Sequence, residues 1–234
     1  GAPVFGITHS GTTFVATSEG LSVTVDDGNW HHLVGTYNGA DIKIWVDGVE
    51  KNSNTIGAVT LTSTANTFEV AGDCNGGIRR YNGSIDEVRV YSRALGSTEI
   101  AALATSGAVK IGASSVDLQK GSTLTSGLVG HWTLDGADVT TTVTDRSGQS
   151  NNGYMRNGMA TSTGKVIGKL GQALEFDGVD DGVRVPAHTS MNIQSDITLA
   201  AWVWLPDTTI KVQGEAIISE SSSLIWDYEL YFDA

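Results

Sequence analysis

Short runs in which apolar and polar residues alternate occur along most of the chain, and they predict β-strands. Two of them, Trp30–Tyr37 and Ile42–Val46, flank an Asn38-Gly39 turn. Asp47-Gly48 follows the second run, and glycine tolerates the positive φ that a type I′ hairpin turn requires. We therefore expect consecutive hairpins in this stretch.

The same alternation predicts strands elsewhere, bounded by turns rich in glycine, asparagine and aspartate. One run is apolar on both faces, Ile197–Leu205, which is typical of a central strand. The polar residues around Asn52 and Asn54 are predicted to form a loop. The other expected strands are Val4–Ile7, Thr13–Ala16, Leu21–Val25, Ala58–Thr62, Thr67–Ala71, Ser84–Tyr91, Leu128–Leu134, Gln172–Asp177, Val183–Val185, Ala216–Ser219 and Leu230–Phe232.

A single short helix interrupts this pattern. Ser97 is expected to cap it, Glu99 lies in its first turn, and Ile100–Leu103 provide its apolar side. Few other segments have a helical period. The sequence thus predicts an all-β protein, an antiparallel β-sandwich with one short helix.

Composition and charge narrow the possible partners. The 234 residues include 29 glycines and only 3 prolines, which suits short strands joined by turns. The formal net charge of −12 argues against nucleic acid and anionic membrane surfaces, because both would repel the chain. No stretch has the length of a membrane span, so no membrane insertion is expected. The single Cys74 excludes an internal disulfide framework.

Longer motifs point to a family. WHHLVGTYNG, IKIWVDG and GSIDEVRVYSRALGSTEI resemble the second half of a laminin G-like domain, which has the concanavalin A-like jelly-roll fold. GLVGHWTLDG, DRSGQSNNG, GKLGQALEFDGVDDGVRVP and ITLAAWVW resemble the first half of the same family. With its serine- and threonine-rich segment ahead of GLVGHWTLDG, the chain is similar to tandem surface repeats from bacteria.

The two halves stand in reversed order. Residues 1–103 resemble the second half, residues 104–126 form the predicted linker, and residues 127–234 resemble the first half. The chain begins without Met and shows no signal peptide, so we expect a mature or excised piece.

Three interpretations of this order are open. In the first, the chain is a circular permutant, whose linker at about 3.3 Å per residue is long enough to span a domain. In the second, it is one repeat of an array, cut at an arbitrary phase. In the third, it is a subunit whose halves complete domains in neighbouring copies. The last two predict head-to-tail assembly of identical domains into an open fibre. We favour the array, because a cut within a strand pair exposes sheet edges and makes a poor natural terminus.

Acidic residues near turns are the candidates for a metal ion. In relatives of the resembled family, an acidic residue at the position of Asp86 often helps to hold a structural calcium ion, and Asp135 is its expected partner. Asp177 and Asp180, with Asp181, form a second cluster. Calcium takes six or more oxygen ligands. The alternative for each cluster is a turn, because Asp side chains bond their own backbone.

A carbohydrate site would need exposed aromatic side chains beside polar groups. The candidates are Trp226, which follows a serine run, Trp45, which is offset from its apolar neighbours and is expected to face outward, and Tyr81, at the end of a loop that would form a binding rim. The other tryptophans lie in alternating strands and are expected in the core: Trp30, Trp132, Trp202 and Trp204.

Catalytic activity is the less favoured hypothesis. Glycosidases with this fold use two carboxylates on one strand face, and Asp227 and Glu229 are the nearest match. The spacing of three acids in that glycosidase group is absent, so we expect no catalysis. The sequence instead predicts a non-catalytic, extracellular cell-surface domain that binds a glycan or another surface ligand in adhesion. The alternative is a purely structural filament subunit.

Overall fold

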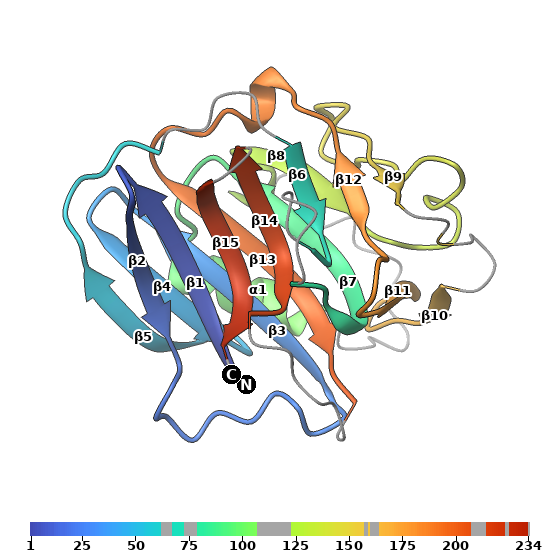
Figure 1. Ribbon diagram of the computed structural model, residues 1–234, viewed down its shortest axis with the longest axis horizontal. Helices are drawn as coiled ribbons and strands as arrows, with labels where there is room; N and C mark the ends of the chain where they lie inside the picture. The colour runs from blue at the N-terminus through green and yellow to red at the C-terminus, as the bar shows by residue number, and fades with distance from the viewer. Residues whose placement is uncertain are drawn as a thin grey trace.

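Two antiparallel sheets are stacked face to face, with one short helix on the outside (Figure 1). This confirms the predicted all-β sandwich. The middle of the expected linker, residues 107–122, lies outside the part of the chain that is described. The computed structural model describes residues 1–61, 67–72, 79–106, 123–156, 159, 164–206, 214–222 and 225–233.

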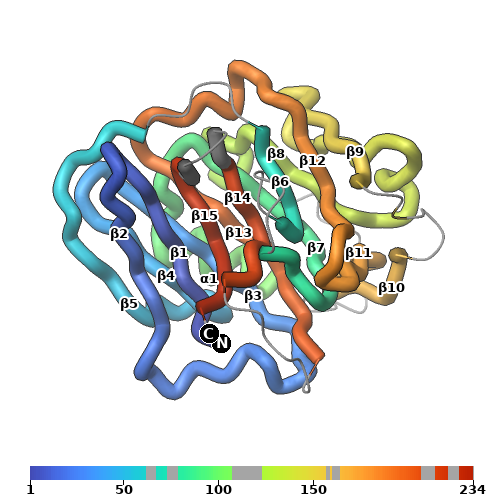
Figure 2. The backbone as a smooth tube through the Cα atoms, in the orientation of Figure 1, coloured from blue at the N-terminus to red at the C-terminus, as the bar shows by residue number. Residues whose placement is uncertain are grey.

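The first sheet contains seven strands in the order β2-β1-β15-β14-β6-β12-β9. β1 pairs with β15 from Ala2, opposite Asp233, to Ile7, opposite Tyr228, so these two strands lie side by side near the chain ends (Figure 2). The strands of this sheet are β1 Ala2–His9, β2 Thr12–Thr17, β6 Thr67–Val70, β9 Tyr154–Met155, β12 Val183–Val185, β14 Ala216–Ser222 and β15 Ile225–Asp233.

The second sheet contains eight strands: seven in the order β10-β11-β7-β13-β3-β4-β5, and β8, which pairs with β7. β13 lies between β7 and β3 and is almost wholly buried, as its two-sided apolar pattern predicts. The strands of this sheet are β3 Trp30–Tyr37, β4 Asp41–Val46, β5 Val49–Thr55, β7 Asn82–Tyr91, β8 Leu128–Trp132, β10 Lys165–Ile167, β11 Gln172–Asp177 and β13 Ile197–Trp204.

Both predicted halves of the chain contribute to both sheets. β13 pairs with β3 and β7 in the eight-stranded sheet, and β14 pairs with β6 in the seven-stranded sheet. Between the sheets, the ring of Trp132 stacks on that of Phe68 with 5.2 Å between centroids. One core is therefore built from both parts. The division at residues 104–126 and the head-to-tail assembly of neighbouring domains stay predictions.

Close packing of the core explains one glycine in the first hairpin. A Cβ at Gly35 would lie 2.3 Å from the ring of Phe5, which packs across from the other sheet. Such an approach is shorter than any real carbon–carbon contact, so β1 and β3 can face each other at this spacing only because position 35 has no side chain.

Edges and loops account for the differences from the predicted strands. β5 was expected to be a loop, but it pairs with β4 at the sheet edge, where most of its side chains face solvent and need no apolar alternation. The Leu21–Val25 run and the described residues 58–61 are not strands. Their apolar residues Val25 and Leu61 are buried and fix loops to the core instead.

The helix α1, Ser97–Thr105, begins one residue earlier than expected, because Gly96 rather than Ser97 is its N-cap. The Glu99 carboxylate accepts a hydrogen bond from the Gly96 N–H at 3.0 Å and pairs with Arg93 at 2.8 Å. The Arg93 guanidinium holds the pKa of Glu99 down at about 2. Ile100 and Leu103 are buried, as predicted for the apolar side of the helix.

Candidate functional site

The outer face of the eight-stranded sheet, turned away from the core, has three zones, and helix α1 covers the first. Val34, Trp45 and Tyr91 pack there against Ile100 and Leu103 of the helix. Trp45 does point away from the core, but it is only 7% exposed, so the prediction that it is an exposed platform for sugars is wrong. The alternation gave its direction correctly and could not show that a distant helix lies over it.

The other two aromatic candidates also fail to provide a platform. Tyr81 is fully buried, stacks on Phe232 with 6.2 Å between ring centroids, and donates its hydroxyl to the Trp204 carbonyl at 3.0 Å. Its predicted exposure in a binding rim is therefore wrong, because it turns inward where β7 begins. Trp226 lies in β15, but its side chain is outside the described part of the structure.

The second zone lies under the turn between β10 and β11, where Asp86 and Asp135 meet the same short segment. Asp86 Oδ2 accepts a hydrogen bond from the Leu170 N–H at 2.8 Å, and Asp135 Oδ1 accepts one from the Gln172 N–H at 2.7 Å. The two carboxylates expected to form a pair therefore accept hydrogen bonds from two amides of the same turn, those of Leu170 and Gln172.

Glycines allow this turn to approach the carboxylates so closely. A Cβ at Gly168 would lie 2.7 Å from Asp86 Oδ2, and one at Gly171 would lie 2.2 Å from Asp135 Oδ1. The residues next to the carboxylates in sequence, Glu87 and Leu134, adopt positive φ values of 54° and 59°. Non-glycine residues with such values are uncommon and concentrate at functional sites.

Electrostatics make Asp86 the most unusual carboxylate of the described chain. It is fully buried, and its Oδ1 atom has no hydrogen-bond partner among the described residues. Its pKa is raised to about 7, chiefly by burial and also by the neighbouring charges of Glu87 and Asp135. An unpartnered carboxylate oxygen beside a second carboxylate and a glycine-rich turn is a donor set that fits a hard cation such as Ca²⁺.

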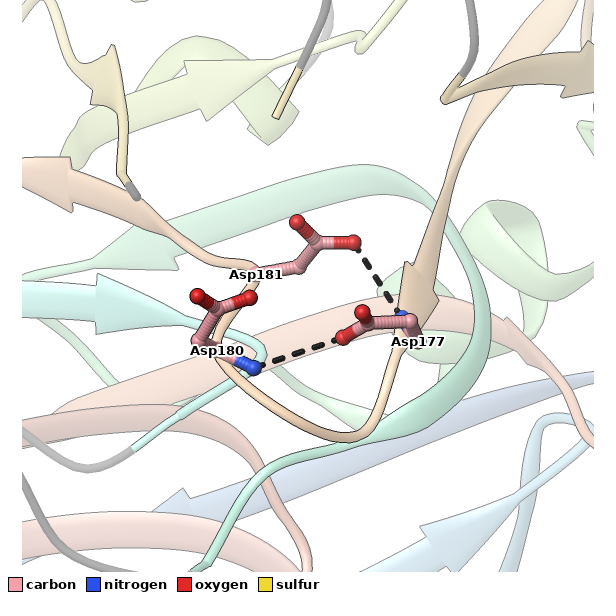
Figure 3. Close-up of side chains that lie close together, drawn as sticks. All are labelled: Asp177, Asp180 and Asp181. Carbon is pink, nitrogen blue, oxygen red and sulfur yellow. Dashed lines mark hydrogen bonds between the residues drawn. The ribbon is translucent and has the colours of Figure 1, made fainter. Parts of the chain in front are cut away.

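The predicted cluster Asp177, Asp180 and Asp181 lies in the turn after β11, with one oxygen of each within 4.8 Å of the others (Figure 3). Asp177 Oδ1 accepts hydrogen bonds from the N–H groups of Val179 at 2.8 Å and Asp180 at 3.3 Å. Asp181 Oδ2 accepts one from the Asp177 N–H at 3.3 Å. These bonds fit the turn alternative, and the metal role of Asp177 and Asp180 stays a prediction.

The third zone carries a row of four residues from adjacent strands, of which one is exposed, two are partly exposed and one, Ser84, is buried. Glu175 of β11 lies opposite Ser84 of β7, Ser84 opposite Trp204 of β13, and Trp204 opposite Trp30 of β3. We call these four residues the open row. Because neighbouring strands lie about 4.8 Å apart, the row is roughly 14 Å wide.

A shallow depression of about 240 Å³ lies over the open row. Val166 and Ile167 of β10 line it together with the four row residues, and Ile167 is 88% exposed. Trp30 and Trp204 are both partly exposed. The depression therefore combines two accessible indoles and a carboxylate with an apolar wall.

Sequence reasoning placed Trp30 and Trp204 in the core, and this is a correction. Both residues are in phase with the outward-facing side of their strands, whereas Leu33 and Val203 are in phase with the core. In β3, Trp30 lies three residues before the inward-facing Leu33, and this odd spacing could have shown that Trp30 faces outward. β13 gave no such signal, because its two faces are equally apolar.

A hydrogen bond to the loop before β3 fixes the orientation of the Trp204 side chain, and a histidine bridge holds that loop in turn. The Trp204 indole N–H donates to the Gly28 carbonyl at 2.7 Å. His31 bridges Asp27, which precedes Gly28, and Asp47, with Nε2 3.1 Å from Asp27 Oδ1 and Nδ1 2.8 Å from Asp47 Oδ2. The hydrogen bond to Asp47 raises the pKa of His31, and the bond from His31 lowers the pKa of Asp27 to about 2.

The carboxylates considered for catalysis lie on the seven-stranded sheet. Asp227 and Glu229 are both buried, and Glu229 Oε2 forms an ion pair with Arg79 Nη1 at 2.7 Å. The Arg79 guanidinium also lies 4.9 Å from the centroid of the Tyr231 ring. The Glu229 carboxylate is therefore engaged by an arginine, which suits a structural ion pair better than a catalytic role.

Comparison with known proteins supports the resemblance of the first part of the chain. Residues 2–101 match the family described as the concanavalin A-like lectin/glucanases superfamily. No curated protein and no solved structure matches the chain. Within the described segments, no helix is both long and apolar enough to cross a membrane. The match covers 100 of the 234 residues, and the two antiparallel sheets are consistent with the β-sandwich of the concanavalin A-like superfamily that it indicates.

Proposed function

We propose that the protein is a non-catalytic, extracellular module that binds a glycan or another cell-surface ligand in adhesion, and that a calcium ion at Asp86 and Asp135 supports its outer face. Laminin G-like domains are generally non-catalytic and typically extracellular, which supports the first part. The Arg79–Glu229 ion pair also supports a non-catalytic module, because Glu229, one of the two candidate catalytic carboxylates, is engaged in a structural contact.

The observation that carries the calcium proposal is the buried, unpartnered Oδ1 atom of Asp86. Asp86 and Asp135 would hold the ion, with further oxygens from backbone and water completing its shell. When bound, calcium would neutralise the two carboxylates, whose mutual repulsion contributes to the raised pKa of Asp86. The carboxylates already bind the N–H groups of Leu170 and Gln172, so fixing them fixes the β10–β11 turn.

Titration calorimetry of protein stripped with EDTA tests this proposal. We expect calcium to bind at one site, and Asp135→Asn to weaken the affinity about tenfold or more, because ligand charge sets calcium affinity. Asp180→Asn is the matched control from the exposed cluster and is expected to change the affinity less than about twofold. A wild-type protein without calcium binding, or a loss confined to Asp180→Asn, would contradict the proposal.

A further inference from the structure

We propose that the depression over the open row is a subsite for one sugar ring of a neutral glycan, with Trp30 and Trp204 as the stacking platform. The inference rests on the ligand-binding function proposed above and names the place and the ligand class. It concerns a different part of the outer face from the acidic pair at Asp86 and Asp135.

The two indoles provide a rigid apolar surface. Trp30 and Trp204 lie opposite each other on adjacent strands, and both are partly exposed although tryptophan is usually well buried. The bond from Trp204 Nε1 to the Gly28 carbonyl fixes its ring before a ligand arrives. Rigid aromatic side chains give a large contact area at low entropic cost, which suits the flat C–H faces of a pyranose ring.

The polar end of the row selects the ligand chemistry. Glu175 is exposed and lines the depression. Its carboxylate is an acceptor for sugar hydroxyl groups, whereas Ser84 beside it is only 4% exposed. A carboxylate on a chain of net charge −12 repels uronate, sulfated and sialylated sugars. The site therefore favours a neutral glycan.

The size of the depression limits the ligand it holds. Its volume of about 240 Å³ is below the roughly 300–1,000 Å³ of pockets for drug-sized molecules, which corresponds to one ring of a longer chain. Ile167 is 88% exposed on its wall, and a bound sugar would cover this apolar side chain.

The turn that Asp86 and Asp135 hold directly follows β10, the strand that forms the apolar wall of the depression. Val166 and Ile167 belong to β10, and the turn that follows β10 is held by Asp86 and Asp135 through the Leu170 and Gln172 amides. Loosening the turn is expected to displace the wall and leave the two indoles in place. Removal of calcium should therefore weaken sugar binding less than loss of an indole does.

The test measures binding of defined tetrasaccharides by calorimetry in the presence of calcium. The neutral probes are β-1,4-linked glucose, mannose and N-acetylglucosamine, and the acidic probe is tetragalacturonate. We expect at least one neutral probe to bind and the acidic probe not to bind. Trp204→Ala is expected to reduce affinity about tenfold or more, and Glu175→Gln about three- to tenfold.

Two further variants keep the result interpretable. Trp204→Phe retains an aromatic face and should bind within about threefold of the Glu175→Gln variant, even if Trp204→Ala folds poorly by circular dichroism. Tyr154→Ala removes an exposed aromatic from the other sheet and should change affinity less than about twofold. Failure of every neutral probe, equal binding of tetragalacturonate, or full affinity in folded Trp204→Ala would overturn the proposal.

The calcium titration on the same samples separates this inference from the proposed function. Calcium binding without sugar binding would remove the subsite and leave the calcium proposal standing. Sugar binding that depends on Trp204 but is accompanied by no calcium binding would retain the subsite and remove the role of Asp86 and Asp135.

Discussion

Replacing Trp132 with alanine is expected to lower the free energy of unfolding by about 3–5 kcal/mol, the range for loss of a large aromatic side chain from a core. Trp132 is fully buried in β8 and stacks on Phe68 of β6. Its indole N–H also donates to the Asn151 carbonyl at 2.9 Å, and this buried acceptor would lose its partner. Urea unfolding followed by circular dichroism measures the change.

The Trp132 variant also tests whether the two parts of the chain share one core. Because Phe68 and Trp132 come from different parts, one cooperative transition is expected for wild type and variant alike. Ile167→Ala, at an 88% exposed position, is the control and should shift stability by less than about 0.5 kcal/mol. Two separate transitions, only one of which responds to Trp132→Ala, would refute the common core.

Replacing Asp86 with asparagine is expected to change stability in opposite directions with and without calcium. In EDTA at pH 8 the variant should be more stable than wild type, because it removes a buried carboxylate that is ionised at that pH. The pKa of Asp86 rises from 3.8 to about 7, and at about 1.4 kcal/mol per unit this gives a gain of up to ~4 kcal/mol. Asparagine keeps an oxygen to accept from the Leu170 N–H.

The pH dependence of the calcium-free protein follows from the same pKa. Below about pH 4, Asp86 is protonated in both the folded and the unfolded state, and its contribution is fully present. As pH rises through about 7, the folded state must give up the proton, and the contribution is lost. The Asp86→Asn variant should lack this part of the decline between pH 4 and pH 8.

Saturating calcium should reverse the order of stability at pH 8, because binding to the folded state stabilises it in proportion to ligand affinity. Wild type then gains stability, and Asp86→Asn gains little. Thermal unfolding in EDTA and in calcium measures both cases. A variant that is less stable than wild type under both conditions would show that Asp86 acts through its fixed hydrogen bond alone.

Alternation predicted most of the strands because each of them buries one face. It missed β5, whose edge position leaves Glu50 and Asn52 in solvent, and it assigned a strand to the loop around Val25, which is buried without joining a sheet. A buried apolar residue is thus a signal of the core, and it specifies a strand only where the neighbouring residues alternate around it.

The residues of a site are harder to predict from the sequence than the strands, because a local pattern does not show which distant segments cover a side chain. The family resemblance paired Asp86 with Asp135, and the structure places both against one turn. The predictions for the aromatic residues were wrong because exposure depends on distant segments: helix α1 covers Trp45, whereas the partly exposed Trp204 belongs to a strand with two apolar faces. Exposure of this kind follows from the stacking of layers, which the periodicity of one segment does not contain.

The most direct test of the account is the position of calcium in crystals grown with the ion and measured by anomalous diffraction. We expect a peak at Asp86 and Asp135, with the Asp86 Oδ1 atom about 2.3–2.6 Å from the ion. A crystal with saturating calcium that shows no peak at this pair, or shows its only peak at Asp177 and Asp180, would contradict the claim that calcium supports the outer face.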